Sequence, residues 1–218
     1  IFREVFSATL ALEKPLKVAF LGPDTTFTHQ MAVKHFGHSC KFNSCSNIES
    51  VFSEVELGNS DYGVVPVENS IEGVVNLTLD CFVDSPLFIC DEARMAISLF
   101  LLANNVDVKK LKTIYSHPQP LAQSRNWLNK NFPGAEQIPA ASTAHAAELA
   151  KKEKNSAAIA GQLAAEIYGL KIVAKNIQDC AENRTRFLVI SKDQAKRAKK
   201  NKTSIMFSIA DEAGSLLK

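Results

Sequence analysis

Several motifs that mark common enzyme classes are missing from this 218-residue sequence. It has no glycine-rich dinucleotide loop, no phosphate loop with Lys-Ser or Lys-Thr, and no Ser/His/Asp nucleophile elbow. Cys40 and Cys45 are not spaced like a zinc knuckle, and no histidine pair completes them. We therefore expect a reaction that needs no cofactor, no metal and no covalent acyl-enzyme. An elimination driven by the substrate's own electronics fits these absences.

A strong charge imbalance and long apolar runs are also missing. The formal net charge is +2, which argues against a dedicated nucleic-acid binder. No apolar run approaches the length of a membrane span, and no cleavable leader is present. We predict reduced thiols in a cytoplasmic protein with neither nucleic acid nor a membrane as partner. The cysteines are odd in number and scattered: Cys40, Cys45, Cys81, Cys90 and Cys180.

The composition that is present suits a folded core. The sequence is 46% hydrophobic and 22% charged, enough for one large domain or two small lobes. Apolar runs such as residues 16–21 and 62–67 alternate with helical patterns such as residues 121–132, expected to be one helix. Residues 87–102 are predicted to be extended. The alternation predicts an α/β fold with largely parallel sheets.

The two ends of the chain differ from its middle. Residues 2–12 have the apolar spacing of a helix without a start signal, which indicates a chain cut from a longer one. Residues 192–202 are basic and lack an apolar face, so they predict a solvated linker, with a nucleic-acid arm as the alternative. Residues 203–209 alternate like a new strand, and the pattern after them indicates the beginning of a second domain.

Polar clusters follow the predicted strands. In open α/β sheets ligands bind outside the carboxyl ends of the strands. Each cluster alone is explained as a helix cap or a turn, but together they predict a pocket of neutral donors, helix N-termini and a cation, suited to carboxylates. The clusters lie at residues 22–28, 68–70, 116–119, 142–143 and 183–187.

The last cluster places a hydroxyl between two guanidinium groups. Thr185 lies between Arg184 and Arg186 at the entry to an apolar strand. Two permanent cations and one hydroxyl suit a small, multiply anionic ligand. The alternative is that both arginines are surface charges and that Thr185 is there as a β-forming residue.

Five motifs occur in one order along the chain. They are Gly22-Pro23-Asp24-Thr25-Thr26-Phe27-Thr28, Pro66-Val67-Glu68-Asn69-Ser70, Ser116-His117-Pro118-Gln119 with Gln123, Ser142-Thr143-Ala144, and Asn183 with Thr185-Arg186-Phe187. Over residues 16–191 this order resembles the prephenate dehydratase family. The family converts prephenate to phenylpyruvate, with loss of water and carbon dioxide, in phenylalanine biosynthesis.

The resemblance implies a fold and a boundary for each part. It implies two α/β lobes like those of type II periplasmic binding proteins, with mainly parallel sheets and a cleft between the lobes. The dehydratase domain would span residues 15–191. Lobe one would comprise residues 16–92 and 178–191, and lobe two residues 93–177.

The resemblance also implies roles for the polar residues. Thr185 would hydrogen-bond the departing ring hydroxyl of prephenate and assist its protonation. Arg186 would supply charge to the site or pair with Glu68 or Asp179, and Arg184 would be a surface residue. The substrate would be positioned by Thr26, Asn69, Ser70, Gln119, Ser142 and Thr143. No cofactor or metal is implied.

Both flanks resemble parts of larger family members. Residues 1–14 resemble the last helix of a chorismate mutase domain, as in bifunctional chorismate mutase/prephenate dehydratase enzymes. Residues 192–202 would be the linker, and residues 203–218 resemble the start of an ACT domain. That domain implies phenylalanine as a feedback inhibitor of the full-length protein, and the family implies a homo-oligomer. Alternatives are an arogenate dehydratase, or a non-catalytic two-lobed module that binds an anionic metabolite.

Two residues depart from the family pattern. Thr25 stands where the family usually has glycine, so we expect a stiffer opening loop or an altered approach of its backbone to substrate. Leu99 stands where many members have histidine, which puts in doubt a role for an imidazole at that position.

Overall fold

The structure of the chain is a computed structural model. It describes residues 4, 9, 15–104, 107–196, 198 and 201–207. The helix expected over residues 2–12, and with it the chorismate mutase fragment, lies outside the described residues apart from two isolated positions. So does most of the segment expected to begin an ACT domain.

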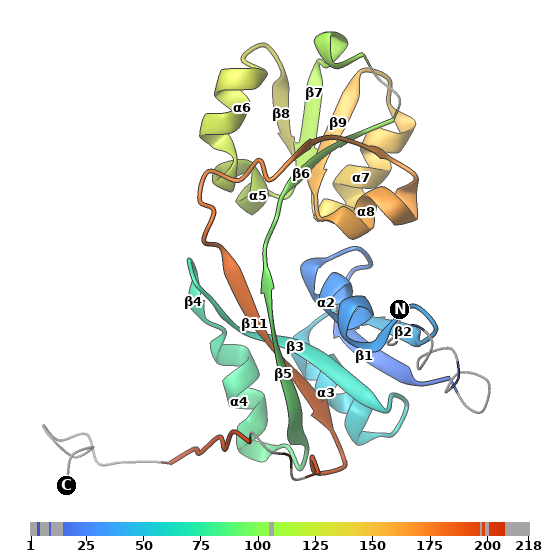
Figure 1. Cartoon of the computed structure of the whole chain (residues 1–218), viewed down its shortest axis with the longest axis vertical. Helices are drawn as coiled ribbons and strands as arrows, with labels where there is room; N and C mark the ends of the chain where they lie inside the picture. The colour runs from blue at the N-terminus through green and yellow to red at the C-terminus, as the bar shows by residue number, and fades with distance from the viewer. Residues whose placement is uncertain are drawn as a thin grey trace, which may run out of the picture.

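The lower lobe in Figure 1 is built on a six-stranded sheet. Its strand order is β2-β1-β3-β11-β5, and β4 pairs with β3 off this path. Three helices pack with it: α2 (Phe27–Phe36), α3 (Ile48–Glu56) and α4 (Asn76–Asp84). The strands are β1 (Lys17–Leu21), β2 (Lys41–Cys45), β3 (Tyr62–Asn69), β4 (Gly73–Val74), β5 (Phe88–Ala96) and β11 (Arg184–Ser191).

The upper lobe contains a five-stranded sheet of order β10-β6-β9-β7-β8. The strands are β6 (Phe100–Ala103), β7 (Thr113–Ser116), β8 (Glu136–Pro139), β9 (Ser156–Ala160) and β10 (Lys171–Lys175). The helices are the 3-10 turn η1 (Val108–Lys110), α5 (Pro118–Gln123), α6 (Arg125–Asn131), α7 (Thr143–Lys152) and α8 (Gln162–Tyr168). The two-lobed α/β fold predicted from the sequence is confirmed.

Both sheets are mixed, so the expectation of mainly parallel sheets holds for only part of each. β1 pairs in parallel with β2 and β3, and β7 pairs in parallel with β8 and β9. In contrast, β11 runs antiparallel to β3 and β5, and β6 runs antiparallel to β9 and β10. The short β4 also runs antiparallel to β3. Both β6 and β11 are the first strands after the chain changes lobe. A strand that has just crossed from the other lobe enters its sheet at the end facing the lobe it came from. It therefore runs in the opposite direction to its neighbours in the sheet.

Two segments connect the lobes, at residues 97–99 and 176–183 (Figure 1). β5 stays in the first sheet as far as Ala96, so the first crossing comes later than the predicted boundary between residues 92 and 93. The crossings are hydrogen-bonded to each other, because Ile97 N donates to Asn183 O at 2.8 Å and Ile177 N donates to Leu99 O at 3.0 Å. Leu99 is fully buried in the upper lobe's apolar core, which explains why an aliphatic side chain suits this position.

The helical pattern of residues 121–132 forms two helices rather than one. Ser124 lies between α5 and α6 with φ −121° and ψ 13°, outside helical geometry. Its buried hydroxyl donates to Pro120 O at 2.7 Å, a local bond that competes with continuation of the helix. Asp179, on the second crossing, accepts from the backbone N–H groups of Asn126 and Trp127, both at 3.0 Å. Because the helix breaks at Ser124, the free N–H groups at the start of α6 are available to bind Asp179 of the second crossing.

Beyond β11 the described residues form no helix or strand. The strand expected over residues 203–209 is absent from its described part, where Ile205, Met206 and Phe207 are exposed. Lys202 Nζ lies 2.6 Å from Glu92 Oε1. None of the five cysteines is joined in a disulfide; Cys45 is buried, Cys180 is exposed and the other three are half-buried. No helix in the described part of the chain is both long and apolar enough to cross a membrane.

Thr25 is strained in the loop that follows β1. Its φ is +66°, in the left-handed region where a β-branched residue is costly. The side chain is 1% exposed, and its hydroxyl oxygen has no hydrogen-bond partner among the described residues. A backbone conformation that favours glycine is thus occupied by threonine, at the position where the family resemblance led us to expect a glycine.

We expect Thr25→Gly to raise the free energy of unfolding by about 1 kcal/mol. Relief of left-handed strain and removal of an unsatisfied buried hydroxyl outweigh the lost side-chain burial and the greater freedom of glycine in the unfolded chain. Thr25→Ala is the matched control, because it removes the hydroxyl but keeps the strain. Urea denaturation of the three proteins measures the differences, and a Gly variant less stable than the Ala variant would contradict this account of the loop.

Candidate active site

The site is formed where the end of β3 meets the beginning of β11. The two strands are antiparallel and place Asn69 directly opposite Thr185, although 116 positions separate the two residues in sequence. Asn69 Nδ2 donates to Thr185 Oγ1 at 2.8 Å. Thr185 as a residue is 8% exposed, so it is largely buried at this end of the strand.

The orientation of the Asn69 amide is fixed by the backbone. Its Oδ1 accepts from Ile71 N at 2.9 Å and from Glu72 N at 3.1 Å. Since backbone N–H groups only donate, the atom facing them must be the oxygen, and the nitrogen must face Thr185. The nitrogen's second hydrogen goes to Asn183 Oδ1, at 2.8 Å. All four hydrogen-bonding positions of this amide are therefore used.

This arrangement sets the polarity of the Thr185 hydroxyl. An amide N–H cannot accept a hydrogen bond, so Thr185 Oγ1 is the acceptor in its contact with Asn69. Its own proton has to point elsewhere, and within the described part of the chain it reaches no protein acceptor. Thr185 thus keeps one hydrogen-bond donor that no described residue uses.

Ser70 and Gln119 lie beside this pair but already have partners. Ser70 Oγ donates to Glu182 O and accepts from Arg184 N, each at 2.9 Å, which fastens the β3 turn to the entry of β11. Gln119, on α5 of the other lobe, donates from Nε2 to Glu72 Oε1 and so links the two lobes. Both predicted substrate-binding residues therefore stabilise the rim in this structure.

Arg186 forms ion pairs within the sheet rather than facing Thr185. Its Nε lies 3.2 Å from Glu68 Oε2 and its Nη1 lies 3.4 Å from Glu92 Oε2. Adjacent strand residues point to opposite faces, so Arg186 and Thr185 diverge. Of the alternatives left open by the sequence, pairing with Glu68 is observed, whereas Asp179 instead caps α6. A hydrogen bond from Lys202, with Arg186 and Arg94 nearby, lowers the pKa of Glu92.

Thr26, Ser142 and Thr143 lie at the beginnings of two ten-residue helices. Thr26 is the N-cap of α2, where its hydroxyl accepts from His29 N at 3.3 Å and donates to Leu21 O at 3.1 Å. Ser142 is the N-cap of α7 and accepts from His145 N at 3.0 Å. Thr143 is the first residue of that helix. Within the described residues the hydroxyls of Thr26 and Ser142 contact their own loops and helices, and neither contacts Thr185.

His29 supports the loop that leads into α2. Its Nδ1 accepts from Thr25 N at 3.0 Å, and its ring stacks on Phe20 with centroids 4.3 Å apart. Burial lowers the pKa of His29, and the nearby Asp24 carboxylate opposes that shift. The neutral ring with Nδ1 unprotonated is therefore the form that fits this loop.

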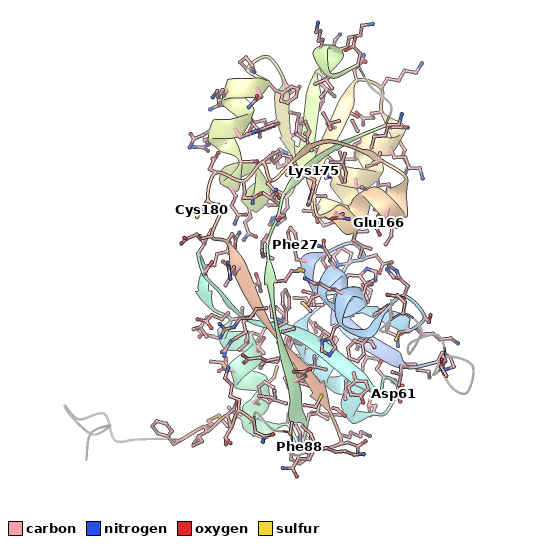
Figure 2. The ribbon with its side chains drawn as sticks, viewed as in Figure 1. Phe27, Asp61, Phe88, Glu166, Lys175 and Cys180 are labelled. Carbon is pink, nitrogen blue, oxygen red and sulfur yellow. The ribbon has the colours of Figure 1, made fainter. Side chains whose placement is uncertain are left out.

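The lobes also meet at α2 and α8. A Cβ built on Gly161 would lie 2.7 Å from Gln30 Oε1 and 3.2 Å from Phe27, so the two helices approach each other closely here. Phe27 contacts the apolar cores of both lobes, and Figure 2 shows it at the level where they meet. Beside it, residues of both helices line an open hollow of about 380 Å³. Thr185 is not among its lining residues.

Sequence reasoning missed three residues that the geometry brings into the site. Glu72 holds Gln119, Asn183 holds Asn69, and Gln123 Oε1 accepts from Asn183 Nδ2 at 3.4 Å. Asn183 and Gln123 fell within the recognised motifs but had been given no role. The amide side chains of Asn183 and Gln123 were the available indication, because buried or half-buried amides need hydrogen-bond partners. Which partners they find depends on how the strands pair.

Comparison with known proteins gives one consistent family. A family model described as prephenate dehydratase matches residues 18–195. The bifunctional chorismate mutase/prephenate dehydratase of Aquifex aeolicus is 50% identical over 218 residues, covering 100% of this chain and 60% of that protein. The chain spans about 60% of the length of this enzyme and of the bifunctional enzyme of Stutzerimonas stutzeri, which is 46% identical over 217 residues.

Solved structures also match the fold of this chain. A prephenate dehydratase from Arthrobacter aurescens in complex with L-Phe matches with a TM-score of 0.76 and 30% identity, covering 93% of this chain and 70% of that one. GqqA, described as a novel type of quorum quenching acylase, matches with a TM-score of 0.73 and 26% identity, covering 85% and 67%. Proteins described by different activities therefore share this fold, and the site has to decide the function.

We expect the stability of the chain to fall as pH drops below about 6.5, the ordinary pKa of histidine, in part because of His29. Burial lowers the pKa of His29 in the folded state, so as the pH falls the unfolded chain binds the proton at a higher pH than the folded chain does. Protonation therefore favours the unfolded chain and lowers the free energy of unfolding. The contribution of His29 is fully present above the unfolded pKa and is lost at up to about 1.4 kcal/mol per pH unit below it.

Urea denaturation between pH 7.5 and 5.5 measures this loss. His29→Gln is expected to show a shallower pH dependence than the wild type, whereas His38→Gln, at an exposed position, is the control and is expected to follow the wild type. Equal slopes for wild type and His29→Gln would show that His29 does not limit the folded state in acid.

Proposed function

This chain belongs to the prephenate dehydratase family, and from that premise we propose that it converts prephenate to phenylpyruvate, water and carbon dioxide. The observation that carries the proposal is the polarity of Thr185. Its hydroxyl accepts from Asn69 and so presents its proton to a ligand. Prephenate needs such a donor, because its ring hydroxyl has to leave as water.

The reaction gains its driving force from aromatisation. The bond from the ring to its carboxylate breaks and releases carbon dioxide, and its electron pair enters the ring. The carbon–oxygen bond to the ring hydroxyl breaks on the other side of the ring, and the departing hydroxide takes up one proton to become water. Threonine is a very weak acid, so Thr185 acts as a hydrogen-bond donor that strengthens as negative charge develops on the departing oxygen, and solvent supplies the net proton.

Helix N-termini are proposed to bind the carboxylates. The first N–H groups of α2 and α7 have no partner within their helices and carry the positive end of the helix dipole. Thr26 and Ser142 fix where these helices begin, and Thr143 is the first residue of α7. Their contribution would then be to aim backbone donors at the substrate, while Asn69 and Ser70 hold Thr185 and its strand in place.

Arg186 is proposed to stabilise the sheet rather than bind substrate. Its guanidinium lies between Glu68 and Glu92, on the strand face opposite Thr185. Gln119 is bound to Glu72 and is proposed to help hold the lobes together. Inhibition by phenylalanine and assembly into a homo-oligomer stay predictions of the family resemblance.

Replacing Thr185 tests the proposal. We expect Thr185→Ala to lower kcat for phenylpyruvate formation by about 100-fold or more, because one well-placed donor to a developing charge is lost. Thr185→Ser keeps the hydroxyl and is expected to retain most of the rate. Assays run with prephenate and, separately, with arogenate also identify the preferred substrate.

Arg186→Gln is the matched control on the same strand. Because Arg186 faces the two glutamates, its replacement is expected to change KM for prephenate by less than about threefold, whereas loss of a direct contact with a carboxylate would cost well over tenfold. Full turnover by Thr185→Ala would remove Thr185 from the mechanism, and a large rise in KM for Arg186→Gln would return Arg186 to the substrate site.

A further inference from the structure

A second buried amide stands behind Asn69. Asn183 is 2% exposed and directly precedes β11. Its Oδ1 accepts from Asn69 Nδ2 at 2.8 Å, and its own Nδ2 donates to Gln123 Oε1 at 3.4 Å. The hydrogen bonds thus diverge from the Asn69 amide nitrogen, which donates to Thr185 on one side and to Asn183 on the other, and Asn183 in turn donates to Gln123.

The contact with Asn183 aligns the hydrogen bond from Asn69 to Thr185. The two hydrogens of an amide nitrogen lie in the plane of the amide group. When one hydrogen of Asn69 Nδ2 points at an acceptor, the direction of the second hydrogen is therefore fixed too. Asn183 supplies the first acceptor, and Thr185 Oγ1 receives the second hydrogen. Without Asn183, the Asn69 amide would keep its backbone contacts to Ile71 and Glu72 but would be free to tilt about them.

Gln123 brings the other lobe into this arrangement. It is the last residue of α5, and its backbone oxygen accepts from Asp179 N at 2.7 Å. Asp179 belongs to the second crossing, a few residues before Asn183. The side chain of Gln123 therefore approaches Asn183 from a helix that is itself fastened to the crossing. The alignment of Asn183 depends on α5 keeping this position.

We propose that Asn183 is a positioning residue for Thr185, supported from the second lobe by Gln123. This inference rests on the proposed dehydratase function, in which Thr185 donates to the departing hydroxyl. Asn183 touches no substrate in this scheme. It holds the Asn69 amide in the alignment in which Nδ2 donates to Thr185, and it makes that alignment depend on contact between the lobes.

A purely structural role for Asn183 makes a different prediction. Its backbone oxygen already joins the crossings by accepting from Ile97 N at 2.8 Å, and that bond needs no particular side chain. A structural side chain would affect stability or KM, and its effect would multiply with that of a Thr185 substitution. A positioning side chain affects kcat and loses its effect once the Thr185 hydroxyl is gone.

Steady-state kinetics with prephenate separates the two roles. We expect Asn183→Ala to lower kcat about 10- to 30-fold with KM within threefold of wild type, and Gln123→Ala to lower kcat about threefold. Asn183→Asp keeps an acceptor for Asn69 and is expected to restore kcat part of the way. Asn131→Ala, an exposed asparagine on α6, is the control and is expected to match wild type. In a Thr185→Ala background, Asn183→Ala is expected to cause no further loss.

An unchanged kcat for Asn183→Ala, or a loss that multiplies with Thr185→Ala, would overturn the inference. A measurement that does not depend on catalysis tests the positioning role separately from the proposed function. Hydrogen exchange of the Asn69 side-chain amide, followed by NMR, is expected to be at least tenfold faster in Asn183→Ala than in wild type. If wild type forms no phenylpyruvate, the proposed function fails, while unchanged exchange rejects the positioning role whatever the activity.

Discussion

The orientation of one amide determines what this site can do. Asn69 presents its oxygen to two backbone N–H groups and its nitrogen to Thr185, and because the backbone cannot reverse its donors, the amide cannot turn over. A threonine hydroxyl that only accepts from its neighbour keeps its proton for a ligand. In the proposed reaction the substrate becomes aromatic on losing hydroxide, and one aligned donor would be the contribution of the protein.

The sheet makes this orientation possible by joining distant parts of the chain. β11 returns from the upper lobe and enters between β3 and β5, so that Thr185 pairs with Asn69 on one side and with Met95 on the other. The two crossings are bonded to each other and to α5 and α6, which couples the lobes at the place where β11 begins. The strain at Thr25 and the ion pairs of Arg186 lie outside this chain of contacts.

Much of the fold and part of the site could be predicted from the sequence. Buried strands such as β1 and β9 are continuous apolar runs, and the caps at Ser142 and Thr26 follow from their residue types. Edge strands β2 and β8 carry too few apolar residues to be recognised, and the direction of β11 depends on the crossings, which no local pattern reveals. Arg186 and Thr185 are adjacent in sequence but face opposite sides of the strand. Their different roles become visible only from their partners, which are Glu68 for Arg186 and Asn69 for Thr185.

The most direct test of the central claim is the kcat of Asn69→Asp with prephenate. The substituted carboxylate still accepts from the backbone of Ile71 and Glu72, but it offers an acceptor where Thr185 now receives a hydrogen bond. The hydroxyl proton should then turn toward that carboxylate and away from the ligand. We predict a loss of kcat of about 100-fold or more in a folded protein. A variant that keeps wild-type kcat would contradict the claim that the Asn69 amide sets the polarity of Thr185.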